Sequence, residues 1–253
     1  TCTANASDFG LMLAWSRLIQ AWTVADERLL VICDDPWLFR HLASIPGIVA
    51  VGEPPSIGAK RVVLELRGFA ARCRYALHAL LAMKSLRASR ARFPKGAPAL
   101  LVYGHPASDV DGTDGYFGSL LQKTPELRRV LHVDCNANRT ERLTGDPRTV
   151  SLHAWGGLVT ALRLLIARWK PTLPAPGDRH YWLIRRAAAI EAGTGQAAAL
   201  LWQGACQQKW LEAARPRIVV WPWENHGWER ELVRMARLLG IATAGYQHRS
   251  EEH

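Results

Sequence analysis

The chain has 253 residues, of which 49% are hydrophobic, and a formal net charge of +10. This hydrophobic content excludes a disordered chain and is enough for one sizeable α/β domain. The positive charge favours anionic partners such as nucleic acid, phosphorylated substrates or anionic lipid. No apolar run reaches the roughly 18–20 residues that span a bilayer.

The cysteine and glycine patterns argue against several kinds of site. The five cysteines are scattered, without a CxxC pair or a Cys/His pair at zinc spacing, which favours a reducing cytoplasm. Neither GxxxxGK[ST] nor GxGxxG after a strand occurs, which argues against classical nucleotide triphosphate hydrolysis and standard dinucleotide binding. GxSxG is also missing, which argues against an α/β-hydrolase.

The N-terminal region predicts a helix and then a strand–helix–strand unit. The apolar residues of Asp8–Trp22 have helical spacing. Leu29–Cys33 and Ile48–Val51 are short apolar runs that are typical of buried strands. Between them, Asp35 is a candidate N-cap and Pro36 a candidate first helical residue. This alternation predicts a parallel sheet with right-handed crossovers.

The segment Lys60–Lys95 contains ten basic residues against a single acid, Glu65, with apolar residues interleaved. The pattern predicts a long basic amphipathic helix. Such a helix is either solvated with one face in the core, attracted to an anionic membrane surface, or bound to nucleic acid. No known nucleic-acid motif accompanies it, which disfavours the third interpretation. The residues predicted to face a membrane are Arg67, Arg72, Arg74, Lys84, Arg87 and Arg90.

The middle of the chain predicts three strands, Ala99–Tyr103, Val130–Asp134 and Val150–Trp155. A glycine- and aspartate-rich loop, 104–118, follows the first strand, and a helix from about Tyr116 to Arg129 precedes the second. The segment 134–141 is predicted to be a loop. Ligands of open α/β sheets collect at the carboxyl ends of strands, so the loop 104–118 is a candidate site.

The loop 104–118 carries His105, Asp109, Asp111 and Asp114, which could place a base near an acceptor hydroxyl. The alternating aspartates superficially resemble a calcium loop. The full twelve-residue loop with its terminal glutamate is absent, which argues against calcium. A turn that is stabilised by the aspartate side chains is the other interpretation.

Three further segments have helical spacing, Gly157–Trp169, His180–Glu191 and Gln196–Ala214. Pro171–Asp178 separates the first two and reads PTLPAPGD, with three prolines in eight residues. It is predicted to be a linker inside a single α/β domain that spans residues 1–253.

The C-terminal segment predicts a complete strand–loop–helix–strand unit. Arg217–Trp221 is a β-branched run, and the apolar residues of Trp228–Leu239 lie on one helical face. Gly240 occupies the position of a helix C-terminal glycine, and Ile241–Gln247 is predicted to be the next strand. Polar residues follow both strands: Glu224, Asn225 and His226 follow the first, and Gln247 and His248 the second.

Carboxylate and imidazole side chains at such strand ends are candidates for proton transfer. Glu224 is a candidate base or a ligand of sugar hydroxyls, with capping of the following helix as the alternative. His226 and His248 are candidates for phosphate contact or proton transfer, with a structural role as the alternative. Glu229 lies in the first helical turn and is predicted to cap the helix or interact with its dipole.

The stretch Pro222–His248, PWENHGWERELVRMARLLGIATAGYQH, resembles bacterial surface-carbohydrate biosynthesis proteins, the GT-B glycosyltransferases that build lipopolysaccharide and capsule. The shared pattern is Glu-Asn, a spacer, Trp-Glu, a helix, and a Gly-Tyr-Gln-His strand end. A second, weaker block is DGYFGSL at 114–120. The main pattern is filled by Glu224, Asn225, Trp228, Glu229, Gly245, Tyr246, Gln247 and His248.

The resemblance implies two Rossmann-like lobes with the active site between them. Residues 1–253 would form the acceptor-side lobe, an α/β fold with a mostly parallel sheet and helices on both faces, and the C-terminal nucleotide-sugar lobe would be absent from this chain. The implied reaction transfers a sugar from a nucleotide-activated donor to a lipid-linked or polysaccharide acceptor. The implied location is the cytoplasmic face of the inner membrane, with the enzyme peripheral on its anionic surface. Neither a metal nor a cofactor is expected.

The expected catalytic residues are Glu224, His105 and Asp109. The expected substrate-binding residues are Asn225, His226, Trp228, Tyr246, Gln247, His248, Asp114 and Tyr116. Two other functions remain open, a non-catalytic membrane-associated binding module of the same fold and a basic nucleic-acid-binding domain. Salt-dependent binding of DNA would support the latter.

Overall fold

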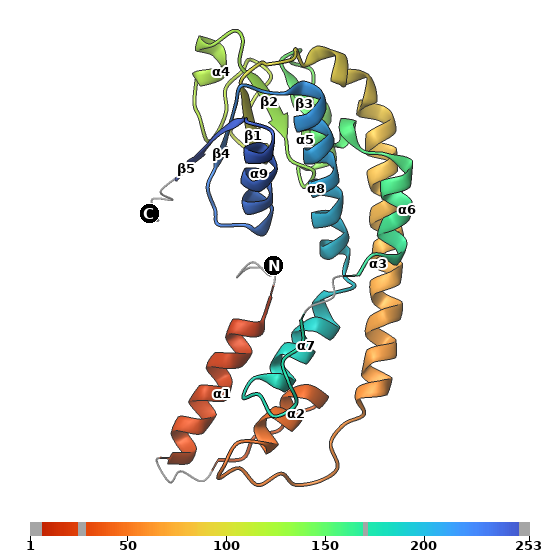
Figure 1. The fold of residues 1–253 in the computed structure, drawn as a ribbon, viewed down its shortest axis with the longest axis vertical. Coiled ribbons are helices and arrows are strands. Elements are labelled where there is room, and N and C mark those ends of the chain that lie inside the picture. Colours follow the sequence, from red (N-terminus) through yellow and green to blue (C-terminus); the bar gives the residue numbers. More distant parts are fainter. Residues whose placement is uncertain (1–6, 25–28, 169–171, 248–253) are drawn as a thin grey trace. The chain divides into compact units, whose positions relative to one another are not determined.

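A computed structural model describes residues 7–24, 29–168 and 172–247 of the chain (Figure 1). The chain divides into two compact units. The first comprises residues 1–72 and 167–197, and the second comprises residues 73–166 and 198–253. The predicted linker falls within the first unit, where its described residues, 172–178, form neither helix nor strand.

The first unit is helical. Its helices are α1 (Phe9–Val24), α2 (Pro36–Ala43), α7 (Tyr181–Glu191) and the first part of α3 (Ile57–Leu86). The predicted start of α2 is confirmed, because the Asp35 side chain accepts hydrogen bonds from the first-turn amides and Pro36 is the first helical residue. Arg186 of α7 pairs with both Asp8 and Asp35, at 2.7 Å each, and so ties α7 to the starts of α1 and α2.

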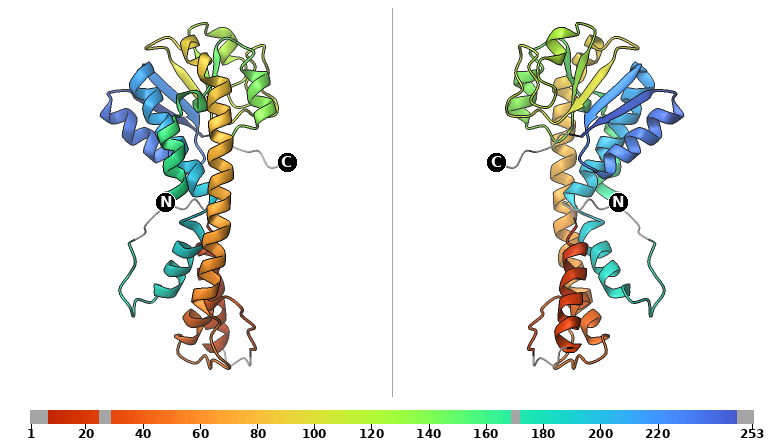
Figure 2. Two further views of the ribbon diagram at one scale, coloured as in Figure 1. Left: turned by 90° about the vertical axis from the view of Figure 1, so that its right-hand side faces the viewer. Right: turned by 90° about the vertical axis from the view of Figure 1, so that its left-hand side faces the viewer.

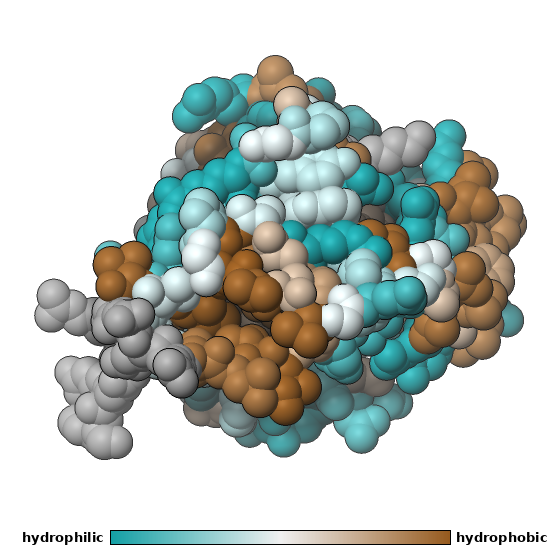
Figure 3. All heavy atoms as spheres, turned by 90° about the horizontal axis from the view of Figure 1, so that it is seen from below, coloured by the Kyte–Doolittle hydropathy of each residue, from teal (hydrophilic) through white to brown (hydrophobic). Residues whose placement is uncertain are grey.

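The two strands that the sequence predicted in this unit do not form. Residues 29–33 and 48–51 are irregular, and Leu30, Ile32, Val49 and Val51 are each at least 85% exposed. A strand needs a neighbour for its backbone hydrogen bonds, and the described part of this unit contains no strand. These apolar side chains are therefore exposed to solvent. Figure 3 shows exposed hydrophobic patches on the face of the molecule that is seen from below.

The second unit contains a five-stranded parallel sheet in the order β3-β2-β1-β4-β5. The strands are β1 (Ala99–Val102), β2 (Arg128–Leu131), β3 (Thr149–Ser151), β4 (Ile218–Pro222) and β5 (Ala242–Tyr246). The strand order reverses between β1 and β4, as in Rossmann-like sheets. The remaining helices that the structure describes are α4 (Leu120–Lys123), α5 (Ala137–Leu143), α6 (Leu158–Ile166), α8 (Gly195–Ala214), α9 (Gly227–Leu238) and the 3-10 helices η1 (Arg87–Arg92) and η2 (Leu152–Trp155).

Helices cover both faces of this sheet (Figure 2). Successive residues of a strand point to opposite faces. Ala99 and Leu101 of β1 pack in a core formed with α3, α6, α8 and α9. Leu100 and Val102 pack in a second core formed with α4 and α5. The predicted α/β class with a parallel sheet is therefore confirmed for this unit.

Element boundaries differ from the prediction in the middle of the chain. The helix expected from Tyr116 to Arg129 is only the single turn α4, and the strand expected at 150–155 ends at Ser151. The segment 134–141, predicted to be a loop, instead contains the start of α5. Asn136 caps α5 by accepting a hydrogen bond from the Asn138 amide, so an N-cap signal was present in the sequence.

The long basic helix is confirmed as α3, which runs for 30 residues and continues into η1. No helix among the described residues has the length and apolarity that crossing a membrane requires.

Candidate functional site

The candidate site lies at the carboxyl edge of the sheet, where β1 and β4 are neighbours. In open α/β sheets, ligands bind at this edge where the strand order reverses. Three segments leave the sheet here, 103–105 after β1, 132–134 after β2 and 223–226 after β4. Each of the three carries at least one histidine.

The loop after β4 is held by specific contacts. Trp223 donates its backbone N–H to the Tyr246 carbonyl at 2.7 Å, which ties the loop to β5. Glu229, in the first turn of α9, is fully buried, and its Oε1 accepts the backbone N–H of Glu224 at 3.1 Å. Asn225 has a positive φ of 60°, a conformation that asparagine tolerates better than most residues. These contacts fix the position of the backbone at Glu224.

Glu224 and His226 form a carboxylate–imidazole pair. The Glu224 Oε2 and His226 Nε2 atoms are 2.9 Å apart. The side chains of Glu224 and His226 are 44% and 20% exposed, so the pair is open to solvent on one side. With Nε2–H donated to the carboxylate, the Nδ1 atom of His226 is the nitrogen that is free to accept a proton.

His226 contacts Tyr103, which belongs to a cluster of packed rings. Its ring centroid lies 6.1 Å from that of Tyr103, and the Tyr103 centroid lies 4.5 Å from that of His132. Trp228 packs on the same group, at 5.9 Å from Tyr103 and 4.9 Å from His132, and its indole N–H donates to the Tyr103 hydroxyl. Trp228 is only 5% exposed and belongs to the core, so the prediction that it binds substrate is wrong for this structure. Burial raises the pKa of Tyr103, so the hydroxyl stays protonated.

His132 and Asp134 were not selected from the sequence, although they follow a predicted strand. His132 is buried, and desolvation lowers its pKa to about 3. It is therefore neutral at pH 7, and its Nδ1 accepts the backbone N–H of Asp134 at 3.2 Å. Burial raises the pKa of Asp134, an effect that the nearby His226 partly offsets. Asp134 is thus a second carboxyl group beside the pair.

The loop 104–118 contributes His105 and Tyr116 to this edge. Their ring centroids lie 5.3 Å apart, and the His105 Nδ1 accepts the backbone N–H of Ala107 at 3.0 Å. Burial raises the pKa of Tyr116, and the charge of Glu224 raises it further.

Asp114 and Asp109 organise the loop. Asp114 is 1% exposed, and its carboxylate accepts the amides of Tyr116 and Phe117. It also lies 3.7 Å from the buried guanidinium of Arg129, which leaves it inaccessible to a substrate in this structure. Asp109 pairs with Arg142 of α5 at 3.2 Å. The interpretation as an aspartate-stabilised turn fits both residues.

The predicted residues near β5 are only partly described. Tyr246 is half exposed, and its ring centroid lies 5.6 Å from that of Phe117. Gln247 is exposed directly after β5. His248 lies outside the described residues.

The six predicted membrane-surface residues do not share one environment. Arg72 is buried and donates to the Gly193 carbonyl at 2.5 Å. Arg90 donates to the carbonyls of Ala154 and Gly156. Backbone oxygens thus hold these two side chains, which are not part of the exposed cationic surface. The exposed members are Arg67, Arg74, Lys84 and Arg87.

Within the described ranges, no group of three or more His, Cys, Asp or Glu side chains is arranged to hold a metal ion. The described site instead combines a carboxylate–imidazole pair, a second carboxyl group and the exposed rings of Trp223 and Tyr246. Such a site can accept a proton from a hydroxyl group and can stack against a sugar ring. Comparison of the chain with protein-family models, curated proteins and solved structures found no match.

Proposed function

We propose that this chain is the acceptor-side lobe of a glycosyltransferase, which transfers a sugar from a nucleotide-activated donor to a lipid-linked or polysaccharide acceptor. The observation that carries the proposal is the Glu224–His226 pair at the carboxyl edge, 2.9 Å apart and open to solvent on one side. The resemblance of Pro222–His248 to GT-B enzymes of surface-carbohydrate synthesis supports the substrate class. The parallel sheet, with its order reversal at β1 and β4, is compatible with a GT-B lobe.

In the proposed step, His226 accepts the proton of the acceptor hydroxyl at Nδ1, and Glu224 stabilises the imidazolium that results. The acceptor oxygen forms a bond with the anomeric carbon of the donor sugar. The bond between that carbon and the donor phosphate oxygen breaks, and its electron pair leaves with the nucleotide. Tyr103 packs beside His226, and Glu229 is a positioning residue that holds the Glu224 backbone.

The proposal includes a peripheral location on an anionic membrane, where a lipid-linked acceptor would be found. Its support is the surface of α3 and η1, on which the exposed cations alternate with exposed apolar side chains. The apolar members are Leu66, Phe69, Leu77 and Leu81. Cationic and apolar groups together favour binding at a membrane surface. The same features would serve a non-catalytic binding module.

Sugar transfer in Glu224→Gln and His226→Gln variants tests the proposal. The protein expressed from its complete reading frame is assayed with labelled nucleotide-sugars and a lipid-linked saccharide acceptor. Each variant is expected to lower kcat by roughly 10²–10⁴-fold, the contribution of a positioned general base. The double variant is expected to be no slower than the slower single variant, because the two groups act as a unit.

Glu126→Gln is the matched control. Glu126 is an exposed carboxylate that forms an ion pair with Arg217 and does not contact Glu224 or His226. It should retain full activity. Unchanged kcat in both Glu224→Gln and His226→Gln would remove the pair from the catalytic role. Acceptor binding without transfer by the unmodified protein, with every donor, would favour the binding module.

A further inference from the structure

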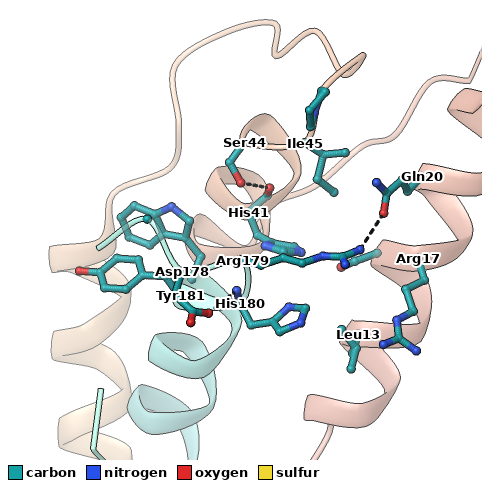
Figure 4. A pocket seen from close by; sticks show the side chains of 14 residues that line it. Leu13, Arg17, Gln20, His41, Ser44, Ile45, Asp178, Arg179, His180 and Tyr181 are labelled. Carbon is teal, nitrogen blue, oxygen red and sulfur yellow. Dashed lines mark hydrogen bonds between the residues drawn. The ribbon is translucent and has the colours of Figure 1, made fainter. Parts of the chain in front are cut away.

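The first unit contains a cavity of about 230 Å³ that the proposed function does not use (Figure 4). It lies between α1, α2 and the segment that leads into α7. Its polar lining includes Arg17, Gln20, His41, Asp178, Arg179 and His180. Its volume is below the roughly 300–1,000 Å³ of pockets for drug-sized ligands, so it suits a small group.

Two arginines from different elements line this cavity. Arg17 comes from α1 and Arg179 from the segment before α7, and Figure 4 shows the Arg179 side chain extending past both histidine rings toward Gln20. Arg179 donates to the Gln20 amide oxygen at 3.2 Å. Among the described residues, neither arginine has a carboxylate within ion-pair distance. Their donors are therefore available to an anion.

Two buried ring nitrogens in the lining lack hydrogen-bond partners among the described residues. His41 is only 4% exposed, and its Nδ1 atom has no partner. The Nδ1 atom of His180 is also buried and has none. The two ring centroids lie 6.5 Å apart. An unsatisfied buried polar atom is unfavourable, so the cavity favours a ligand that hydrogen-bonds to these nitrogens.

The electrostatics of the cavity favour an anion. Burial lowers the pKa of His41, and the charges of His180 and Arg179 lower it further. The cavity also adjoins the N-terminus of α7, where the N-cap residue, His180, makes no side-chain cap hydrogen bond. The one carboxylate in the lining, Asp178, accepts the backbone N–H of His180 at 2.8 Å. It offsets only part of the charge of the two arginines.

We propose that this cavity binds a phosphoryl group, either inorganic phosphate or the monoester headgroup of a lipid. Arg17 and Arg179 supply charge-assisted hydrogen bonds, and the His41 and His180 rings supply donors from the buried side. The proposal does not depend on the sugar-transfer function, because every lining residue belongs to the first unit.

Calorimetric titration of the full chain with inorganic phosphate at constant ionic strength tests the site. Arg17→Ala and Arg179→Ala are each expected to weaken binding about tenfold or more, the effect of removing a charge-assisted hydrogen bond. Arg179→Lys, which keeps the charge, should restore part of the affinity. Arg61→Ala is the matched control, because Arg61 is an exposed cation of the same unit outside the cavity lining.

Vesicles of phosphatidylcholine with phosphatidic acid distinguish the two sources of the phosphoryl group. A lipid headgroup is assigned if the chain binds these vesicles but not free phosphate, and if Arg17→Ala and Arg179→Ala each lose the vesicle binding. Binding of free phosphate that is lost in the same variants assigns a soluble ligand. The proposal is overturned if neither probe binds, or if all the binding that is observed is the same in the two variants as in the unmodified chain. Both arginines are exposed, and thermal unfolding of each variant checks that the fold is retained.

Discussion

At the residue scale, the core of the second unit contains a buried histidine with both ring nitrogens satisfied. His153 Nε2 donates to the Val133 carbonyl at 3.0 Å, and its Nδ1 accepts the Trp202 indole N–H at 3.0 Å. Desolvation lowers the pKa of His153 to about 4. The neutral ring is thus part of the packing, because a protonated Nδ1 could no longer accept from the indole. This differs from His226, whose position at the open edge suits proton transfer.

The titration of His153 predicts a pH dependence of stability. Its pKa rises from about 4 in the folded state to its ordinary value of 6.5 on unfolding, so the unfolded chain binds the proton more tightly. The free energy of unfolding is therefore expected to fall as the pH drops from about 6.5 to about 4, by up to about 1.4 kcal/mol per pH unit for this residue. Urea unfolding between pH 7.5 and 4 measures it.

His153→Gln is expected to be less stable at pH 7.5 but to have a flatter pH profile, since the titrating group is gone. His132, whose pKa is about 3, contributes in the same direction and remains in the variant. An unchanged slope in His153→Gln would show that other groups determine the acid sensitivity.

At the element scale, α2 shows how far local chemistry predicts structure. Asp35 and Pro36 specify the start of the helix through a cap and a preset φ, and both interactions are local in the chain. The strands predicted on either side of α2 failed, because a strand depends on a partner that local chemistry does not supply. The prediction of a longer helix before β2 was wrong for a similar reason. Arg128 and Arg129 belong to β2, because they pair with β1.

Substitutions of Asp35 separate its two roles, the cap of α2 and the partner of Arg186. Asp35→Ala removes both and is expected to lower the free energy of unfolding by roughly 2–4 kcal/mol. Asp35→Asn keeps a cap of similar strength but loses the charge, so it should cost less. Chemical unfolding followed by far-UV circular dichroism measures both. Equal losses in the two variants would contradict a capping role.

At the scale of the whole molecule, the net charge of +10 is the dominant electrostatic property. Part of it lies on α3 and η1, where the exposed cations accompany exposed apolar side chains. Each basic residue near an anionic membrane contributes about 1 kcal/mol, and added salt screens this attraction.

Binding to vesicles tests whether this surface holds the protein on a membrane. The triple variant Arg67→Glu, Arg74→Glu and Arg87→Glu is expected to bind phosphatidylglycerol-containing vesicles at least tenfold more weakly than the unmodified chain. Binding of the unmodified chain should fall as salt rises. Co-sedimentation with vesicles measures both effects.

The matched control places the same three charge reversals on exposed positions of α9, Arg230, Arg234 and Arg237. If binding fell equally in both triple variants, net charge rather than the α3 surface would be responsible. Loss of phosphatidylglycerol binding in Arg179→Ala alone would instead point to the cavity of the first unit.

The sequence by itself determined the features that depend on neighbours along the chain. These are α1, α2, α3 and α9, the apolar strands of the second unit, and the polar residues Glu224 and His226 directly after β4. Helices and caps are formed by contacts within a few residues, and a strand inside a regular α/β alternation has a pattern of its own.

Only the tertiary structure decided which of these residues meet. Strand order places β1 beside β4, and this brings Tyr103 and His132 to the Glu224–His226 pair. Burial decided that Asp114 and Arg72 are structural and that Glu229 positions the loop. The cavity lined by Arg17 and Arg179 lies between segments that are far apart in the chain. No periodic pattern in the sequence predicts that these segments meet. Packing of the whole chain decides which distant segments contact each other, and local sequence patterns do not contain this information.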